Sequence, residues 1–216
     1  MSPQGQGFAH SSLLGARAEH VYEWFLKSLH LPGDVAECGV YGGATSRELV
    51  RHLEENGLAK TVHMFDTFEG FPDAVTDEEK GLSTWAELGQ GLYACPLDEV
   101  VRAMAPFTQY RIHRGTFADT FAAFSEPLCF IHSDGDLYQS TIDTIELADR
   151  LLVAGGCIVF DDYNNPRLPG VRLAVERFLN PRDYEIMPAR NTIQCYAVKR
   201  AAGAAPGGSG GGVGEL

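Results

Sequence analysis

The sequence lacks several features that mark particular classes of protein. It has no run of about 18 apolar residues, and its first twelve residues, MSPQGQGFAHSS, contain neither a basic stretch nor an apolar one. It has 17 basic residues against 29 acidic ones, a formal net charge of −12, and no run of Lys or Arg longer than two. We therefore expect a cytoplasmic protein that binds neither nucleic acid nor a membrane.

Cysteine is scarce and scattered. The chain has five cysteines and no CxxC motif, and Cys129, Cys157 and Cys195 lie inside apolar runs. This pattern predicts reduced thiols in the core rather than a structural zinc site.

Apolar, β-rich runs alternate with amphipathic stretches along most of the chain, which favours parallel βα units. The length of 216 residues suits one α/β domain. Strands are predicted at about 34–40, 61–66, 109–113, 128–134, 156–161, 183–187 and 193–199. Helices are predicted at about 13–30, 44–56, 97–104, 117–124, 138–152 and 169–179.

Three segments stand apart from this alternation. We expect residues 1–33 to form an N-terminal helical segment ahead of the main domain, 34–200. Its apolar residues around Trp24 and Phe25 are expected to contact either the core or a second copy of the chain in a dimer. Residues 201–216 are rich in glycine and predict a disordered tail. Residues 67–96, with a weak helical patch around Trp85, exceed an ordinary βα loop and predict a lid.

Acidic residues recur where the predicted strands end. They are Glu37, Asp66, Asp134, Asp136, Asp161 and Asp162. In open α/β sheets, ligands bind at the carboxyl ends of the parallel strands. Each acid alone could be a helix N-cap, but Asp161 and Asp162 are consecutive and one residue caps only one helix start. A cation would relieve their repulsion with Asp134, and oxygen donors favour Mg²⁺.

A glycine segment, ECGVYGGATS at 37–46, follows the first predicted strand. It reads G-x-x-G-G rather than G-x-G-x-x-G and has no neighbouring Lys or Arg for a pyrophosphate. Its glycines let a ligand approach the backbone, and the acids at Glu37 and Asp66 suit a ligand with a cationic amine and a ribose diol. S-adenosylmethionine has both groups.

Read together with this segment, FDTFEGFP at 65–72, SDGDLYQST at 133–141 and IVFDDY at 158–163 resemble the macrocin O-methyltransferase family. Its members are magnesium-dependent class I S-adenosylmethionine enzymes that methylate hydroxyls on sugars of natural products, including antibiotics. The resemblance covers residues 34–198. It implies a Rossmann-like α/β fold with seven strands in the order 3-2-1-4-5-7-6, strand 7 being antiparallel. We also expect a homo-oligomer, such as a homodimer.

The resemblance also implies roles for individual residues. The metal positions are Asp134, Asp161 and Asp162. The cofactor positions are Glu37, Gly39, Tyr41, Ser46, Asp66, Thr67, Gly115, Thr116 and Phe117. Asp134 and Asp136 are both candidates for the general base, and the sequence does not choose between them. Two roles stay open for His132, His113 and Tyr138: each is either a core residue with satisfied hydrogen bonds or a catalytic residue.

Four other interpretations stay open. The acceptor could be a phenol or catechol, because a metal-bound diol need not belong to a sugar. The domain could be a binding module without catalysis. A dehalogenase-like phosphatase would use Asp134-Gly-Asp136 as its D-x-D motif, although the motif comes late in the chain and has Tyr138 where Thr is needed. A nicotinamide-dependent oxidoreductase is the fourth.

Overall fold

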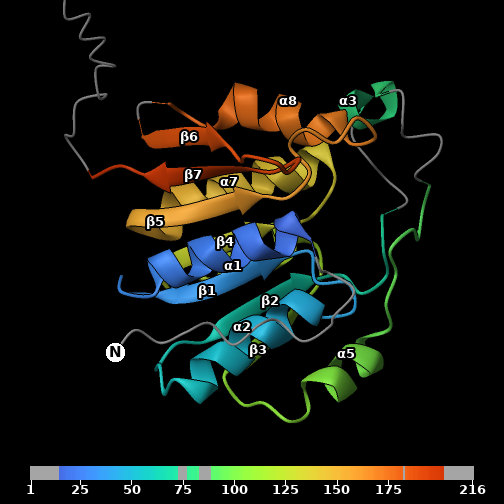
Figure 1. Ribbon diagram of the computed structural model, residues 1–216. Helices are drawn as coiled ribbons and strands as arrows, with labels where there is room; N and C mark the ends of the chain where they lie inside the picture. The colour runs from blue at the N-terminus through green and yellow to red at the C-terminus, as the bar shows by residue number, and fades with distance from the viewer. Residues whose placement is uncertain (1–14, 73–76, 83–88, 182, 202–216) are drawn as a thin grey trace, which may run out of the picture.

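The computed structural model describes residues 15–72, 77–82, 89–181 and 183–201. The predicted tail beyond residue 201, the first 14 residues and Trp85 therefore lie outside the described residues. Seven strands form one sheet in the order β3-β2-β1-β4-β5-β7-β6 (Figure 1). The strands are β1 Asp34–Cys38, β2 Val62–Asp66, β3 Tyr110–Arg114, β4 Leu128–Ser133, β5 Leu152–Phe160, β6 Tyr184–Pro188 and β7 Cys195–Lys199.

The strand directions confirm the predicted Rossmann-like topology. Strands β1 to β5 pair in parallel, and β7 runs antiparallel to both β5 and β6. The centre of the sheet is apolar on both faces because helices cover both, as is usual for parallel strands. In β4, Phe130 faces one layer of the core and Ile131 the other, since successive side chains of a strand point to opposite faces.

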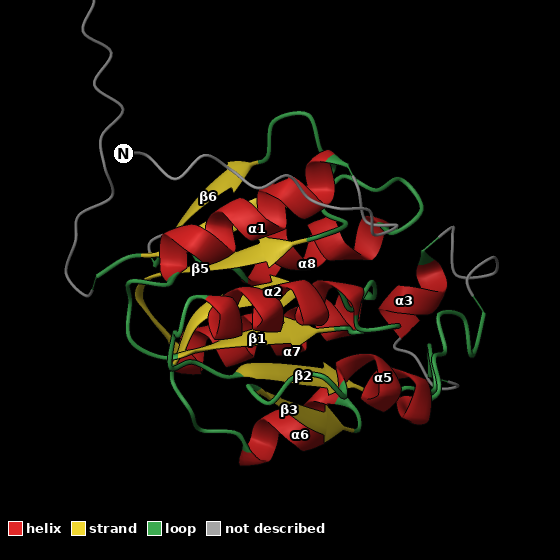
Figure 2. Cartoon of the chain, turned by 60° about the horizontal axis from the view of Figure 1, so that its bottom comes forward, coloured by secondary structure: helices red, strands yellow, loops and turns green. Residues whose placement is uncertain are grey.

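Helices cover the two faces of the sheet (Figures 1 and 2). The helices are α1 Ala16–Ser28, α2 Ala44–Glu55, α3 Asp77–Gly81, α5 Leu97–Met104, α6 Phe117–Ala123, α7 Tyr138–Leu151 and α8 Pro169–Phe178. Side chains of α1, α2 and α5 share one core layer, and those of α6, α7 and α8 share the other. In α1, Phe25 is fully buried against Phe130, and Trp24 stacks on Tyr196 with ring centroids 4.1 Å apart. Both aromatics thus pack within their own chain, and the homodimer stays a prediction.

One element boundary differs clearly from the sequence prediction. Strand β5 begins at Leu152, directly after α7, rather than near residue 156. Leu152 pairs with Leu128 across an irregularity in the β4–β5 ladder, and Gly155 adopts a φ of 81° within it. Gly155 and Gly156 thus lie inside the strand, within the irregular part of its pairing with β4.

The described part of the predicted lid contains a short helix, α3. The helical patch expected around Trp85 lies outside the described residues. The lid's described parts are tied together, because the amide of Phe71 donates to Leu92 O at 3.0 Å and Gly91 N donates to Phe71 O at 3.0 Å. The Glu79 carboxylate also accepts from the Tyr138 amide at 2.6 Å, which links the lid to the start of α7. Closure over a ligand stays a prediction.

All five cysteines are buried and free, which confirms the prediction of core thiols. No helix in the described part of the chain is long and apolar enough to cross a membrane.

Candidate active site

The carboxyl ends of the parallel strands point toward the side of the molecule where α3 lies (Figure 2). Residues that follow these strand ends line a cavity of about 640 Å³. Its volume is in the range typical of small-molecule sites. The predicted site residues that line it are Gly39, Tyr41, Asp66, Thr67, Thr116, Phe117, Asp134, Asp136 and Asp162. The remaining predicted residues, Glu37, Ser46, Gly115 and Asp161, do not line it, and Glu37, Ser46 and Asp161 are buried.

Asp66 holds the glycine segment in place. One of its carboxylate oxygens accepts hydrogen bonds from the amides of Val40, at 2.7 Å, and Tyr41, at 3.0 Å. The other oxygen accepts from the amide of Phe68 at 2.7 Å. Because Tyr41 and Phe68 have positive φ values of 49° and 61°, the carboxylate also stabilises a backbone shape that L-residues rarely adopt.

Gly39 lines the cavity, and it also allows two segments of backbone to pack closely. Its φ is 93°, and a Cβ at this position would overlap the carbonyl group of Asp134. The Asp134 amide donates to Cys38 O at 2.8 Å, so the chain after β4 runs directly beside the end of β1. Glycine is needed here to bring Asp134 beside the glycine segment.

Behind the cavity, a chain of buried polar side chains connects α2 to the end of β5. The hydroxyl of Ser46 donates to Glu37 Oε2, and Glu37 Oε1 lies 3.1 Å from His132 Nδ1. His132 Nε2 in turn lies 3.5 Å from Asp161 Oδ1. Glu37 and Ser46 therefore lie beneath the glycine segment, where they are 2% and 0% exposed, instead of at its surface.

His132 is a satisfied buried residue rather than an exposed catalytic one. Burial alone lowers its pKa, but the hydrogen bond with Glu37 and the charges of Asp134 and Glu37 outweigh burial, so the pKa is raised. The other two residues in question also have structural partners. His113 Nε2 lies 3.0 Å from His63 Nδ1 on the neighbouring strand, and the Tyr138 hydroxyl accepts from Arg177 at 3.2 Å.

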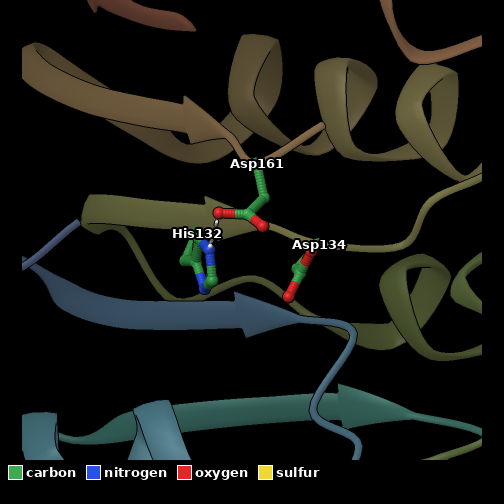
Figure 3. Close-up of side chains that lie close together, drawn as sticks. All are labelled: His132, Asp134 and Asp161. Carbon is green, nitrogen blue, oxygen red and sulfur yellow. Dashed lines mark hydrogen bonds and ion pairs between the residues drawn. The ribbon is translucent and has the colours of Figure 1, made fainter. Parts of the chain in front are cut away.

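Four aspartates converge where β4 and β5 end. Figure 3 shows Asp161 reaching from the end of β5 toward His132 and Asp134. Ligand atoms of His132, Asp134 and Asp161 lie within 4.8 Å of one another, as do those of Asp134, Asp136 and Asp162. Asp134 belongs to both groups, whereas Asp161 and Asp162 fall in different ones. The predicted metal residues are thus neighbours around Asp134 rather than one tight set of three.

Burial and neighbouring charges raise the pKa values of two aspartates in this cluster. Burial raises the pKa of Asp134 to about 6, helped by the charges of Asp162 and Glu37 and opposed by His132. Burial, followed by the charges of Asp134 and Asp162, raises the pKa of Asp136 well above its ordinary value. Carboxylates that resist ionisation in this way gain from a nearby cation.

Three site residues were not found by sequence reasoning. Arg17 in the first turn of α1 forms an ion pair with Asp161 Oδ2 and approaches both oxygens of Asp162 at 3.4 Å. Gln194 donates to Asp161 Oδ1, and Asn165 donates to Asp162 Oδ1 at 2.7 Å. Asn165 follows the Asp-Asp pair closely and could have been suspected, but no local pattern marks Arg17 or Gln194.

The lid supplies an aromatic wall to the cavity. Tyr93 packs edge-on against Tyr41 and Phe71, with ring centroids 6.3 Å and 5.5 Å away. Tyr41 is 60% exposed and Tyr93 46%, so both rings offer surface to a ligand. Burial raises the pKa of the Tyr93 phenol, and the charges of Asp136, Asp162 and Asp134 raise it further, which places the phenol close to the aspartates.

This strand order, with an acid-rich cavity at the carboxyl ends of the strands, defines a class I methyltransferase fold. The solved structure of the O-methyltransferase NovP has the same fold, with a TM-score of 0.75 and 24% identity over 86% of this chain and 80% of NovP. Residues 9–197 match the model of the macrocin O-methyltransferase (TylF) family. The chain belongs to that family, which confirms the resemblance seen in the sequence.

Two characterised relatives come from actinomycetes. The chain is 35% identical over 144 residues to the 8-demethyl-8-(2,3-dimethoxy-alpha-L-rhamnosyl)-tetracenomycin-C 4'-O-methyltransferase of Streptomyces olivaceus, covering 62% of this chain. It is 32% identical over 160 residues to the mycinamicin III 3''-O-methyltransferase of Micromonospora griseorubida, covering 68% of this chain. The matches span 54% and 61% of the two relatives' own lengths.

Replacing Asp66 by asparagine should weaken the binding of S-adenosylhomocysteine about tenfold or more. An amide keeps one acceptor oxygen but loses the charge and the second acceptor, and a hydrogen bond to a charged group is typically stronger than a neutral one. Isothermal titration calorimetry measures the effect. Glu69→Ala removes an exposed carboxylate three residues away and is the control. Equal affinities of Asp66→Asn and wild type would remove Asp66 from the cofactor site.

Proposed function

We propose that this protein is a magnesium-dependent O-methyltransferase that transfers a methyl group from S-adenosylmethionine to a hydroxyl on a sugar moiety of a natural product. One observation carries the proposal: the aspartate cluster and the Asp66-clamped glycine segment open on the same cavity. Donor and metal-held acceptor could therefore meet there. The names of the two relatives specify O-methylation of a rhamnosyl-tetracenomycin and of mycinamicin III, and the first of them supports a sugar hydroxyl as the acceptor.

The residues present fit a divalent cation. The cluster offers carboxylate oxygens from Asp134, Asp136, Asp161 and Asp162, and oxygen ligands are those that Mg²⁺ prefers. Burial, together with the charges of neighbouring carboxylates, raises the pKa values of Asp134 and Asp136, and a cation would favour their ionised forms. Asp134, Asp161 and Asp162 are the residues we expect to hold the ion, and His132 and Gln194 orient Asp161 from behind.

The cofactor residues also fit their ligand. Asp66 fixes the shape of the segment from Gly39 to Tyr41, and we infer that the ribose diol of S-adenosylmethionine lies against it. Thr116 and Phe117, which also line the cavity, would contact the adenine. Glu37 and Ser46, which the resemblance also assigns to the cofactor, are buried and bonded to each other. Their contact with the cofactor stays a prediction. Gly115 has a φ of 145° and lets the chain turn between β3 and α6.

S-adenosylmethionine supplies an electrophilic methyl group on a sulfonium, and Mg²⁺ supplies Lewis acidity that favours the ionised hydroxyl. Transfer of that methyl group from sulfur to the acceptor oxygen would leave S-adenosylhomocysteine as the second product. The protein's contribution is to align the reacting atoms and to exclude water, because in-line displacement depends on positioning. The hydroxyl proton passes to a carboxylate of the cluster.

Asp136 is the better candidate for that carboxylate. Asp134 belongs to both groups of potential metal ligands, so its oxygens are needed to hold the ion. Asp136 lines the cavity and belongs to only one of the two groups, so its carboxylate can accept the proton while Asp134 holds the ion. Its φ of 63° directs a non-glycine residue into an uncommon conformation, as is frequent at catalytic positions.

A methyl-transfer assay tests the proposal. Purified protein, S-adenosylmethionine with a labelled methyl group and Mg²⁺ are incubated with a panel of glycosylated natural products, their aglycones and simple catechols. We expect labelled product from glycosides alone. Product from catechols alone would favour a phenolic acceptor, for which the aromatic wall of Tyr41, Phe71 and Tyr93 offers stacking surface. Cofactor binding without any product would favour a non-catalytic module.

A further inference from the structure

Arg17 is a cation placed where the proposed metal ion is expected. It lies in the first turn of α1, which packs over β4 and β5, while its partners are about two-thirds of the chain away in sequence. Its guanidinium Nη2 pairs with Asp161 Oδ2 and lies 3.4 Å from each oxygen of Asp162. One side chain therefore neutralises the two consecutive aspartates at the end of β5.

The hydrogen bonds of Asp161 limit how it could bind a metal ion. Its Oδ1 accepts from Gln194 and faces His132 Nε2 at 3.5 Å. Its Oδ2 is the oxygen that contacts Arg17. A metal ion that bound Asp161 through Oδ2 would meet the guanidinium at the same atom, and a divalent and a monovalent cation at that distance repel each other strongly.

Arg17 can leave this position while α1 stays docked. The arginine side chain is 45% exposed and lines the cavity, so it has an open route away from the aspartates. His20, one turn further along α1, holds the helix independently, because its Nδ1 lies 3.0 Å from Gln194 Oε1. A rotation of the Arg17 side chain is thus enough to vacate Oδ2 of Asp161.

We propose that Arg17 is a built-in counter-cation of the metal site. It pairs with Asp161 and Asp162 in the metal-free protein, and the incoming divalent ion displaces it. The inference rests on the proposed function, because it takes the aspartate cluster to be the metal site. Arg17 then sets the metal affinity by competing for the same oxygens, and it stabilises the metal-free fold by reducing the repulsion among the aspartates.

The competition predicts that losing Arg17 strengthens metal binding. For Arg17→Gln, the dissociation constant of Mg²⁺, measured by calorimetry on EDTA-treated and dialysed protein, should fall about tenfold. Arg17→Lys keeps the charge and should stay closer to wild type. Lys27→Gln makes the same change of charge on the exposed side of α1 and is the matched control, with an affinity within about twofold of wild type.

Thermal unfolding gives a second readout that does not depend on activity. In EDTA, Arg17→Gln should unfold at a lower temperature than wild type and Lys27→Gln. Added Mg²⁺ should raise its melting temperature by more than it raises that of wild type, because tighter binding stabilises the folded state more.

If wild type binds Mg²⁺ and Arg17→Gln binds it equally or more weakly, Arg17 is no competitor, whereas the proposed function is unaffected. If neither protein binds Mg²⁺ or Mn²⁺, both the metal-dependent function and this inference are wrong.

Discussion

Replacing Asp134 by alanine should lower kcat for methyl transfer by at least about a hundredfold while the dissociation constant of S-adenosylhomocysteine changes little. Asp134 is the one aspartate shared by both groups of potential metal ligands, so its loss weakens every arrangement of the ion. A neutral hydroxyl hardly ionises at pH 7 without such an ion. The adenosine part of the cofactor is bound elsewhere, along Asp66 and the glycine segment, and should not be disturbed.

Steady-state kinetics and calorimetry on the same preparations check this expectation. Asp98→Ala, which removes an exposed aspartate on α5 away from the cavity, is the control and should keep wild-type kinetics. The Asp134 backbone is held by its hydrogen bond to Cys38, so the variant should fold, and its melting temperature verifies this. EDTA should abolish the activity of wild type and Mg²⁺ should restore it. A metal-stripped enzyme working at the full rate would mean that the aspartates act as caps or as a direct base.

The second large effect concerns stability. Replacing His132 by leucine should lower the free energy of unfolding by about 3–5 kcal/mol, because a buried charged group loses its partner. Glu37 is 2% exposed, and in the variant it would keep the Ser46 hydroxyl but lose the imidazole. Asp161 would lose a neighbour at the same time, since His132 contacts both acids.

Urea denaturation measures this loss. His132→Gln restores a group that can hydrogen-bond to Glu37 and should recover part of the stability. His52→Leu is the matched control: His52 is only half-buried and bonds the neutral Tyr22 hydroxyl at 2.7 Å, so its loss should cost about 1 kcal/mol. If the two leucine variants were equally stable, the buried chain from Ser46 to Asp161 would not contribute as argued.

The class of fold and the family of enzyme could both be predicted from the sequence. Alternating apolar and amphipathic segments specify parallel βα units, because both faces of a parallel sheet must be covered. Since parallel strands end at one edge, the acids that follow them, from Asp66 to Asp162, had to lie near one another there. The motifs at 65–72, 133–141 and 158–163 gave the family and with it the strand order.

Two features of the site could be seen only in the folded protein. They are the residues from distant segments that contact the aspartates, and the acids that are buried instead of lining the cavity. Glu37 in β1 and Ser46 in α2 are buried because their side chains bond to each other between the strand and the helix. Their spacing in the sequence does not reveal this contact. Gly39 is required by the Asp134 carbonyl, a contact between two separate strands. Arg17 contacts Asp161 from α1, and Gln194 contacts it from the position just before β7. Such contacts depend on how helices and strands pack in space, and local sequence patterns carry no signal for them.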